Sequence, residues 1–425
     1  MTDGSTVPAD DGIHRTVLPS GIRVVTEHMP EARSVTTGFW VAVGSRDEPE
    51  QLSGASHFLE HLLFKGTEHR SARQIAETVD AVGGEMNAFT AKEHTAYYTR
   101  LPATELVAGL ELLSEVITEP AFRLNEVEAE RQVILEELLM DEDDPDDLVH
   151  TLLFQGLFPG HPLGWETVGT RDSIQTMTRD DIAGFFAHHY HPVNLVVAAA
   201  GALDHDRVVA GVQACFAGNA GGERPPRQAP DRPPEPLTVH RRDTEQAHVA
   251  LGWRAVPFDD PDRYPLAVLN QVLGGGMASR LFQEVREERG LAYSVGSGTS
   301  LFADSGALVV YVGAALGRST EALTVIDAVV ADLVADGITA RELEVAKGFI
   351  SGSMVLGLED SGSRMGRLGA SETIRGFVTS VDEHLERIAA VTLDDVQRVA
   401  GRVFAGPRAL AAVGPFDEGR FSDWV

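Results

Sequence analysis

The sequence contains almost no cysteine and no long apolar run. Cys215 is the single cysteine among 425 residues, which excludes an intramolecular disulfide and a metal site built from several thiolates. No stretch approaches the roughly 18 consecutive apolar residues that a membrane-spanning helix needs, so we expect no membrane segment. The start of the chain, MTDGSTVPADDGIH, lacks the apolar core of a secretory signal. These absences predict a cytoplasmic protein.

Positive charge is also scarce. The chain has 35 Lys and Arg against 64 Asp and Glu, a formal net charge of −29. Nucleic-acid binding requires a basic surface, so we exclude nucleic acid as a partner. The densest acidic run, DEDDPDD at 141–147, is expected to form a solvated loop after a helix. The alternative interpretation is a negative surface that attracts basic peptides.

Two similar segments indicate that the chain holds two copies of one domain. Residues 177–204 and 391–417 each combine a Thr-x-Asp-Asp helix start, an amphipathic helix, a proline, an apolar strand and a glycine. The two threonines are 214 residues apart and the two glycines are 213 apart. Such a constant offset indicates an ancestral duplication, with a period far too long for a solenoid.

A segment rich in proline and glycine, 217–236, is predicted to be a stiff linker between the copies. The expected domains are therefore 1–216, which carries the catalytic motif described below, and 237–425. Both mix strands with helices, which predicts the α+β class, with helices covering a largely antiparallel sheet. Strands are expected at 21–29, 35–44, 95–101, 194–201, 247–256, 291–300, 307–316 and 408–414, and helices at 71–82, 104–118 and 124–140.

The stretch SHFLEHLLFKGT, residues 56–67, predicts a helix that is buried and yet carries ionisable side chains. His57 and His61 are four residues apart, so a helix projects both rings from one face, and Glu60 borders that face. Burying a carboxylate without a partner costs on the order of several kcal/mol. A zinc ion held by both imidazoles removes this cost, with Glu60 accepting a proton from metal-bound water. The alternative is a core helix with two hydrogen-bonded histidines.

The helix expected at 124–140 supplies further carboxylates. Glu130 and Glu137 lie on a stripe that is otherwise apolar, and a catalytic zinc commonly takes a carboxylate as its third protein ligand. Pairing with surface arginines is the alternative for both. Asn125 is expected to cap this helix, with Glu128 as its reciprocal partner.

The pattern His57-x-x-Glu60-His61, followed after 75 residues by Glu137, resembles the pitrilysin/insulinase family of zinc peptidases with an inverted motif. The resemblance implies one Zn²⁺ per chain, bound by His57, His61 and Glu137. It also implies that Glu60 is the general base and that Glu130 supports a ligand through a hydrogen bond. The implied activity is endopeptidase hydrolysis of extended peptides inside an enclosed chamber.

The segment GGEMNAFTAKEHTAYY, 83–98, resembles the substrate-binding strand of that family. There an open edge strand pairs with the peptide through main-chain hydrogen bonds, which depend little on side chains. The resemblance assigns substrate binding to Asn87, Ala88, Phe89 and Thr90. The alternative is a simple hairpin with a Gly-Gly turn.

The segment 273–297 in the second copy resembles the part of the family's inactive half that completes the active site. Tyr293 is expected to donate a hydrogen bond to the oxyanion, and Arg286 to bind a substrate carbonyl. Arg289, one turn away, is a competing candidate for Arg286. The alternative for these arginines is a surface ion pair with a nearby glutamate.

The second copy is expected to be inactive, because its corresponding helix, YPLAVLNQVL, contains no histidine and no acid. The length of the chain is similar to that of subunits in the two-domain branch of the family, which includes mitochondrial processing peptidase subunits and bacterial homologues. This implies a homodimer, with a heterodimer as the alternative, and leaves open which chain completes the cleft. A non-catalytic scaffold, or a subunit active only with a partner chain, is the rival function. The substrates are expected to be peptides, with a weak preference for basic ones.

Overall fold

The chain divides into two compact units, each assembled from three segments. The computed structural model describes residues 12–216 and 221–424. The first 11 residues, most of the stretch that lacks a signal, and residues 217–220 of the predicted linker lie outside the described residues. The first unit contains the chain up to Leu138, Glu166–Arg227 and Val355–Val381, and the second contains Leu139–Trp165, Gln228–Met354 and Asp382–Val425.

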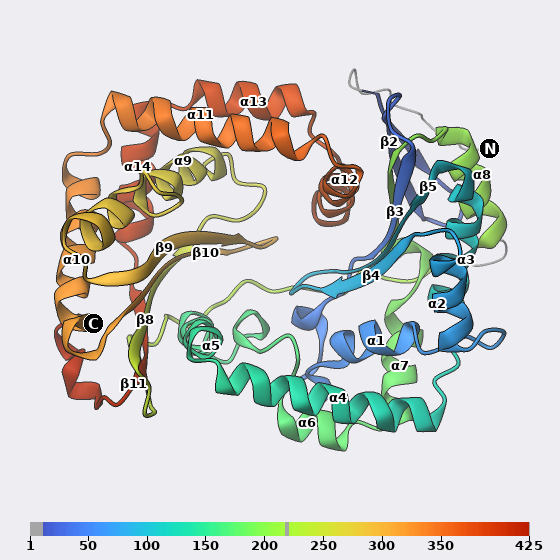
Figure 1. Cartoon of the computed structure of the whole chain (residues 1–425), viewed down its shortest axis with the longest axis horizontal. Helices are drawn as coiled ribbons and strands as arrows, with labels where there is room; N and C mark the ends of the chain where they lie inside the picture. Colours follow the sequence, from blue (N-terminus) through green and yellow to red (C-terminus); the bar gives the residue numbers. More distant parts are fainter. Residues whose placement is uncertain (1–11, 217–220, 425) are drawn as a thin grey trace. The chain divides into compact units, whose positions relative to one another are not determined.

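The first unit is built on a six-stranded sheet in the order β1-β2-β6-β3-β5-β4. The pairing of β2 with β6 is parallel, and the other pairings are antiparallel. The strands are β1 Ile13–Val17, β2 Arg23–His28, β3 Ser34–Val41, β4 Glu85–Thr90, β5 Thr95–Pro102 and β6 Leu195–Gly201. The helices are α1 Ala55–Leu63, α2 Ala72–Asp80, α3 Leu106–Thr118, α4 Leu124–Asp143, α6 Arg171–Thr176, α7 Arg179–His189, α8 His205–Cys215 and α12 Ser361–Arg375 (Figure 1).

The second unit is built on a five-stranded sheet in the order β7-β11-β8-β10-β9. Here β7 and β11 are parallel, and the remaining pairings are antiparallel. The strands are β7 Leu237–Arg241, β8 Gln246–Ala255, β9 Ala292–Leu301, β10 Gly306–Ala315 and β11 Arg408–Gly414. The helices are α5 Pro145–Leu157, α9 Arg263–Leu273, α10 Ser319–Ala335, α11 Ala340–Gly357, α13 Val381–Ala390 and α14 Leu393–Phe404.

The two sheets share one topology, which confirms the predicted pair of homologous α+β domains. The order β2-β6-β3-β5-β4 corresponds strand by strand to β7-β11-β8-β10-β9, including the parallel pair. Thr178 and Thr392 both form capping boxes, with Asp181 and Asp395 respectively, at the starts of the equivalent helices α7 and α14. The predicted strands are all present. The short strands β1 and β7 were not predicted.

Each unit receives one helix from the other half of the chain. The predicted domain boundaries did not include this exchange. Helix α12 comes from the C-terminal half of the chain and packs on the first sheet, beside β3 and β6 (Figure 1). Helix α5 comes from the N-terminal half and packs on the second sheet, against β8 and β11. The compact units therefore differ from the continuous stretches 1–216 and 237–425 that the duplication suggests.

The exchange explains why the central strands are buried on both faces. Along β6, Leu195 and Val197 face the core that contains α1 and α3, whereas Val196 and Ala198 face α12. The second sheet has the same arrangement, with small side chains such as Ala250 under α5. Small side chains on the covered face let each helix approach its sheet closely.

Two local predictions at α4 and α5 are wrong. The acidic run 141–147 is not a loop after a helix, because α4 continues to Asp143 and Asp144 caps α5 through the N–H of Asp146. Acidic residues in the first turn of α5 favour its start electrostatically. Helix α4 begins at Leu124, so Asn125 lies inside the first turn and does not cap it. Glu128 instead forms an ion pair with Arg131.

Among the described residues, no helix combines the length and the apolar character that crossing a bilayer would require.

The contact between α12 and β3 yields a stability prediction. A Cβ at Gly369 would lie 2.1 Å from Nε1 of Trp40, whereas a Cβ at Gly366 on the same helix meets no atom within 4 Å. Gly369→Ala should lower the free energy of unfolding by about 1–3 kcal/mol through overpacking. Gly366→Ala, the matched control, should leave it unchanged or raise it by up to about 1 kcal/mol. The midpoints of thermal unfolding check this, and equal midpoints for the two variants would contradict the packing.

Candidate metal and catalytic site

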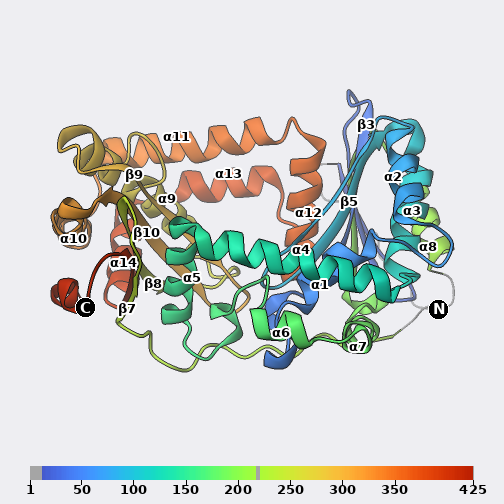
Figure 2. The same ribbon diagram turned by 60° about the horizontal axis from the view of Figure 1, so that its bottom comes forward.

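Helices α1 and α4 lie alongside one another in the first unit, and both views show them together (Figures 1 and 2). Helix α1 buries Phe58, Leu59, Leu62 and Leu63 in the core of that unit. From α4, Val127, Ile134 and Leu138 enter the same core. These apolar side chains fix the spacing of the two helices, so the polar residues between them are held in defined positions.

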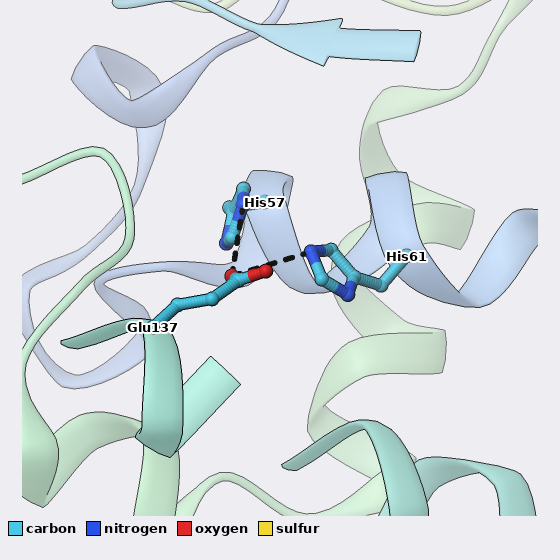
Figure 3. A group of neighbouring side chains, drawn as sticks. All are labelled: His57, His61 and Glu137. Carbon is cyan, nitrogen blue, oxygen red and sulfur yellow. Dashed lines mark ion pairs between the residues drawn. The ribbon is translucent and has the colours of Figure 1, made fainter. Parts of the chain in front are cut away.

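His57, His61 and Glu137 converge between the two helices (Figure 3). One ligand atom from each lies within 4.8 Å of the others. Oε2 of Glu137 is 3.8 Å from Nε2 of His57 and 3.5 Å from Nε2 of His61. Atoms that bind a tetrahedral zinc at about 2.0–2.1 Å are separated by about 3.4 Å, so the arrangement fits this ion with little movement. Within residues 12–216 and 221–424, no other group of three such side chains meets this geometry.

The two histidines have different surroundings. His61 places Nδ1 3.1 Å from Oε2 of Glu130, and Lys65 approaches Oε1 of the same carboxylate at 2.8 Å. A carboxylate at Nδ1 holds the proton there and leaves Nε2 with a lone pair for a metal. The side chain of His57 is 14% exposed, and its partial burial, with the nearby His61, lowers its pKa to about 4. A neutral imidazole is the form that binds a metal ion.

Glu60 is held by the edge strand. The hydroxyl of Thr90 in β4 donates to Oε2 of Glu60 over 2.6 Å. Burial raises the pKa of Glu60, while the hydroxyl and backbone N–H of Thr90 lower it. A carboxylate with a raised pKa beside a metal site is suited to accept a proton near neutral pH.

Strand β4 is the edge strand that the sequence predicts. It pairs with β5 at the end of the sheet, and no other strand of the described chain pairs with it. The amide N–H of Ala88 donates to the side chain of Asn87 over 2.8 Å. Thr90 faces Glu60, whereas the ring of Phe89 points to the other face and contacts Trp40 edge-on at 5.4 Å. Any contribution of Phe89 to peptide binding is thus through its backbone or its exposed ring edge.

Arg286 and Tyr293 belong to the second unit. Arg286 lies in a π-helical segment, Phe282–Glu288, and its guanidinium stacks on the rings of Phe282 and Tyr293 at 4.8 and 4.7 Å. Tyr293, on β9, is 76% exposed. Arg289 donates to Glu284 over 2.6 Å and Arg286 pairs with Glu287 at 3.5 Å, so both arginines form the surface ion pairs considered as the alternative. Arg286 contacts the ring of Tyr293 in addition.

Sequence reasoning did not assign a role to Lys65, although a signal was present. Lys65 is four residues after His61, a spacing that would put both on one face if the helix predicted at 56–67 continued, and it is one of only three lysines in the chain; α1 ends at Leu63, so Lys65 lies in the turn that follows. The hydroxyl contact between Thr90 and Glu60 had no such signal, because it joins an edge strand to a helix 30 residues away.

Family models match most of the chain. Residues 23–171 match the insulinase family, peptidase family M16, and residues 176–348 match the M16 inactive domain. The second match covers the half in which α9 carries no metal-binding side chain, as the sequence predicted.

Individual relatives and a solved structure support the same family. The chain is 45% identical to a protein of Mycobacterium leprae over 95% of its own length and 92% of that protein. It is 39% identical to a protein of Bacillus subtilis over 95% of its own length and 98% of that protein. Both relatives are named uncharacterized zinc proteases. Among solved structures, a protease from Helicobacter pylori has a TM-score of 0.89 at 25% identity and covers 95% of this chain and 99% of its own. The chain is therefore a member of the pitrilysin/insulinase family of two-domain zinc peptidases, family M16.

Proposed function

We propose that this protein is a zinc-dependent endopeptidase that hydrolyses extended peptides, with Glu60 as the general base. The observation that carries the proposal is the convergence of His57, His61 and Glu137 beside Glu60. Family membership supports peptidase activity and zinc, and the finer assignments depend on the chemistry of this group.

The donor set suits one zinc ion per chain. Two neutral imidazoles and one carboxylate are the ligands of a common type of catalytic zinc, which keeps a further position open. When bound, zinc would supply Lewis-acid polarisation of the peptide carbonyl and would acidify the attacking water. Glu130 keeps the ring of His61 oriented, and Lys65 balances the charge of Glu130.

Glu60 accepts the proton of the attacking water and later delivers a proton to the leaving amine. Thr90 fixes one oxygen of this carboxylate, so the other can point towards the reacting water. Strand β4 binds the peptide backbone along Asn87–Thr90, because an unpaired edge offers main-chain donors and acceptors at regular intervals. The same strand therefore holds the substrate and orients the base.

Further elements of the proposal concern the second unit and the assembly. Tyr293 donates a hydrogen bond to the developing oxyanion, and Arg286, stacked on it, binds a substrate carbonyl. These residues come from the same chain or from a second copy in a homodimer that encloses the peptide in a chamber. The net charge of −29 favours basic peptides by electrostatic attraction.

Replacing the base tests the mechanism directly. Glu60→Gln should retain one zinc per chain and lose about 10²–10⁴-fold in kcat, because the amide cannot accept the proton. Zinc content and hydrolysis of a quenched fluorescent peptide measure both quantities. Glu77→Gln, an exposed residue that pairs with Arg73, should behave as wild type. Full turnover by Glu60→Gln would rule out this base, and a wild type without zinc would contradict the proposal.

The hydroxyl of Thr90 provides a second test. Thr90→Val keeps the shape of the side chain and removes the donor to Glu60, so kcat should fall about 10- to 100-fold while zinc content stays the same. Thr90→Ser retains the hydroxyl and should restore most of kcat. Steady-state kinetics on the same peptide distinguish the two variants. Equal kcat for valine and serine would show that the hydroxyl does not position the base.

Support of His61 by Glu130 predicts a change in zinc affinity. Glu130→Gln removes the charge that Nδ1 of His61 and Lys65 share, and should raise the dissociation constant of zinc about 10- to 100-fold. Glu136→Gln changes the same charge on the exposed face of α4 and should have no effect. Competition with a chelator of known affinity measures both constants. Unchanged affinity in Glu130→Gln would mean that α1 alone orients the ring.

A further inference from the structure

The first turn of α1 has no capping side chain of its own. Its N-cap is Gly54, with φ 92° and ψ 1°, a left-handed conformation that suits glycine. The free N–H groups at a helix start need acceptors when they are buried. Here both oxygens of Glu48 provide them: Oε2 accepts from the N–H of Gly54 and Oε1 from that of Ser56, each over 2.7 Å.

Glu48 is itself held firmly in place. Glu48 is 4% exposed; burial raises its pKa, and the hydrogen bonds from the two backbone N–H groups, which favour the carboxylate, oppose this shift. Its neighbours anchor the same segment: Arg46 pairs with buried Glu93 at 2.6 Å, and Asp47 pairs with Arg227 at 2.8 Å. Because the carboxylate is shielded from solvent, water cannot easily replace it at the start of α1.

Gly54 is also confined by packing. A Cβ at this position would lie 2.5 Å from the carbonyl oxygen of Val168. The carbonyl of Ser53, the preceding residue, accepts a hydrogen bond from Ser173 over 2.7 Å. The turn before α1 is therefore positioned from both sides.

The two histidines of the site differ in what orients them. His61 is oriented through Nδ1 by Glu130. Nδ1 of His57 is buried and has no hydrogen-bond partner within the described part of the chain. Metal-binding histidines usually have such a partner. His57 follows Ser56 directly, so its position depends on the backbone of the first turn.

We propose that Glu48 is a positioning residue that fixes the first turn of α1 and thereby places His57 for the metal. This inference rests on the proposed zinc site and adds a residue outside the motif to it. Glu48 does not touch the metal ligands, and acts only through the N–H groups of Gly54 and Ser56.

The test compares Glu48→Gln with Glu50→Gln, an exposed residue of the same segment that undergoes the same change of charge. In the metal-free protein, amide hydrogen exchange in residues 53–57 should become about tenfold faster or more in Glu48→Gln. Exchange in α3, Leu106–Thr118, should not change, which separates a local loss from global destabilisation. The dissociation constant of zinc should rise about tenfold or more, and Glu50→Gln should match wild type in all three measurements.

Glu48→Asp keeps the charge but is one methylene shorter, so it cannot reach both N–H groups, and it carries the test if Glu48→Gln does not fold. As in Glu48→Gln, amide exchange in residues 53–57 should become faster and the dissociation constant of zinc should rise. Unchanged zinc affinity, or weaker affinity without faster exchange in 53–57, overturns the proposal. If the wild-type protein binds no zinc, the proposed function fails separately. Exchange in the metal-free variants then decides whether Glu48 holds the helix, and no change there overturns that role too.

Discussion

Partly buried ionisable side chains between α1 and α4 impose the constraint that the surrounding structure satisfies. An imidazole or carboxylate removed from water needs partners, or its burial destabilises the fold. Glu130 pairs with His61 and Lys65, and Glu60 accepts a hydrogen bond from Thr90. The apolar residues of both helices enclose these contacts, so the site is arranged before any ligand binds. Such preorganisation is costly to build and is found where chemistry requires fixed geometry.

The local part of the site could be predicted from the sequence, because helix periodicity alone places His57 and His61 on one face. The third ligand could not be derived in this way. Glu137 is separated from His61 by 75 residues, and nothing in the spacing of its own helix distinguishes it from Glu130. Only resemblance to a family separated their roles. The geometry agrees, with Glu137 facing both Nε2 atoms and Glu130 facing Nδ1 of His61.

The features that sequence reasoning missed all depend on tertiary contacts. Strand pattern and the internal repeat were sufficient for two homologous, largely antiparallel sheets, but not for their strand order or for the short strands β1 and β7. They gave no indication that α5 would pack on the second sheet and α12 on the first, because the apolar face of an amphipathic helix does not specify which sheet it covers. The cap on α1 was missed for a similar reason: Glu48 acts from six to eight residues upstream, beyond the range of the usual capping patterns.

The exchange of helices has a consequence for how the protein is made. Glu372 of α12 forms ion pairs with Arg15 and Arg23, and Met365 contacts Trp40, so the first sheet is covered on that face by residues near the end of the chain. At ordinary rates of synthesis, about 10 to 35 s pass between the emergence of β6 and that of α12. During this interval the arginines and apolar side chains of the uncovered face remain exposed on the ribosome. The first unit therefore cannot complete its fold until α12 has been synthesised.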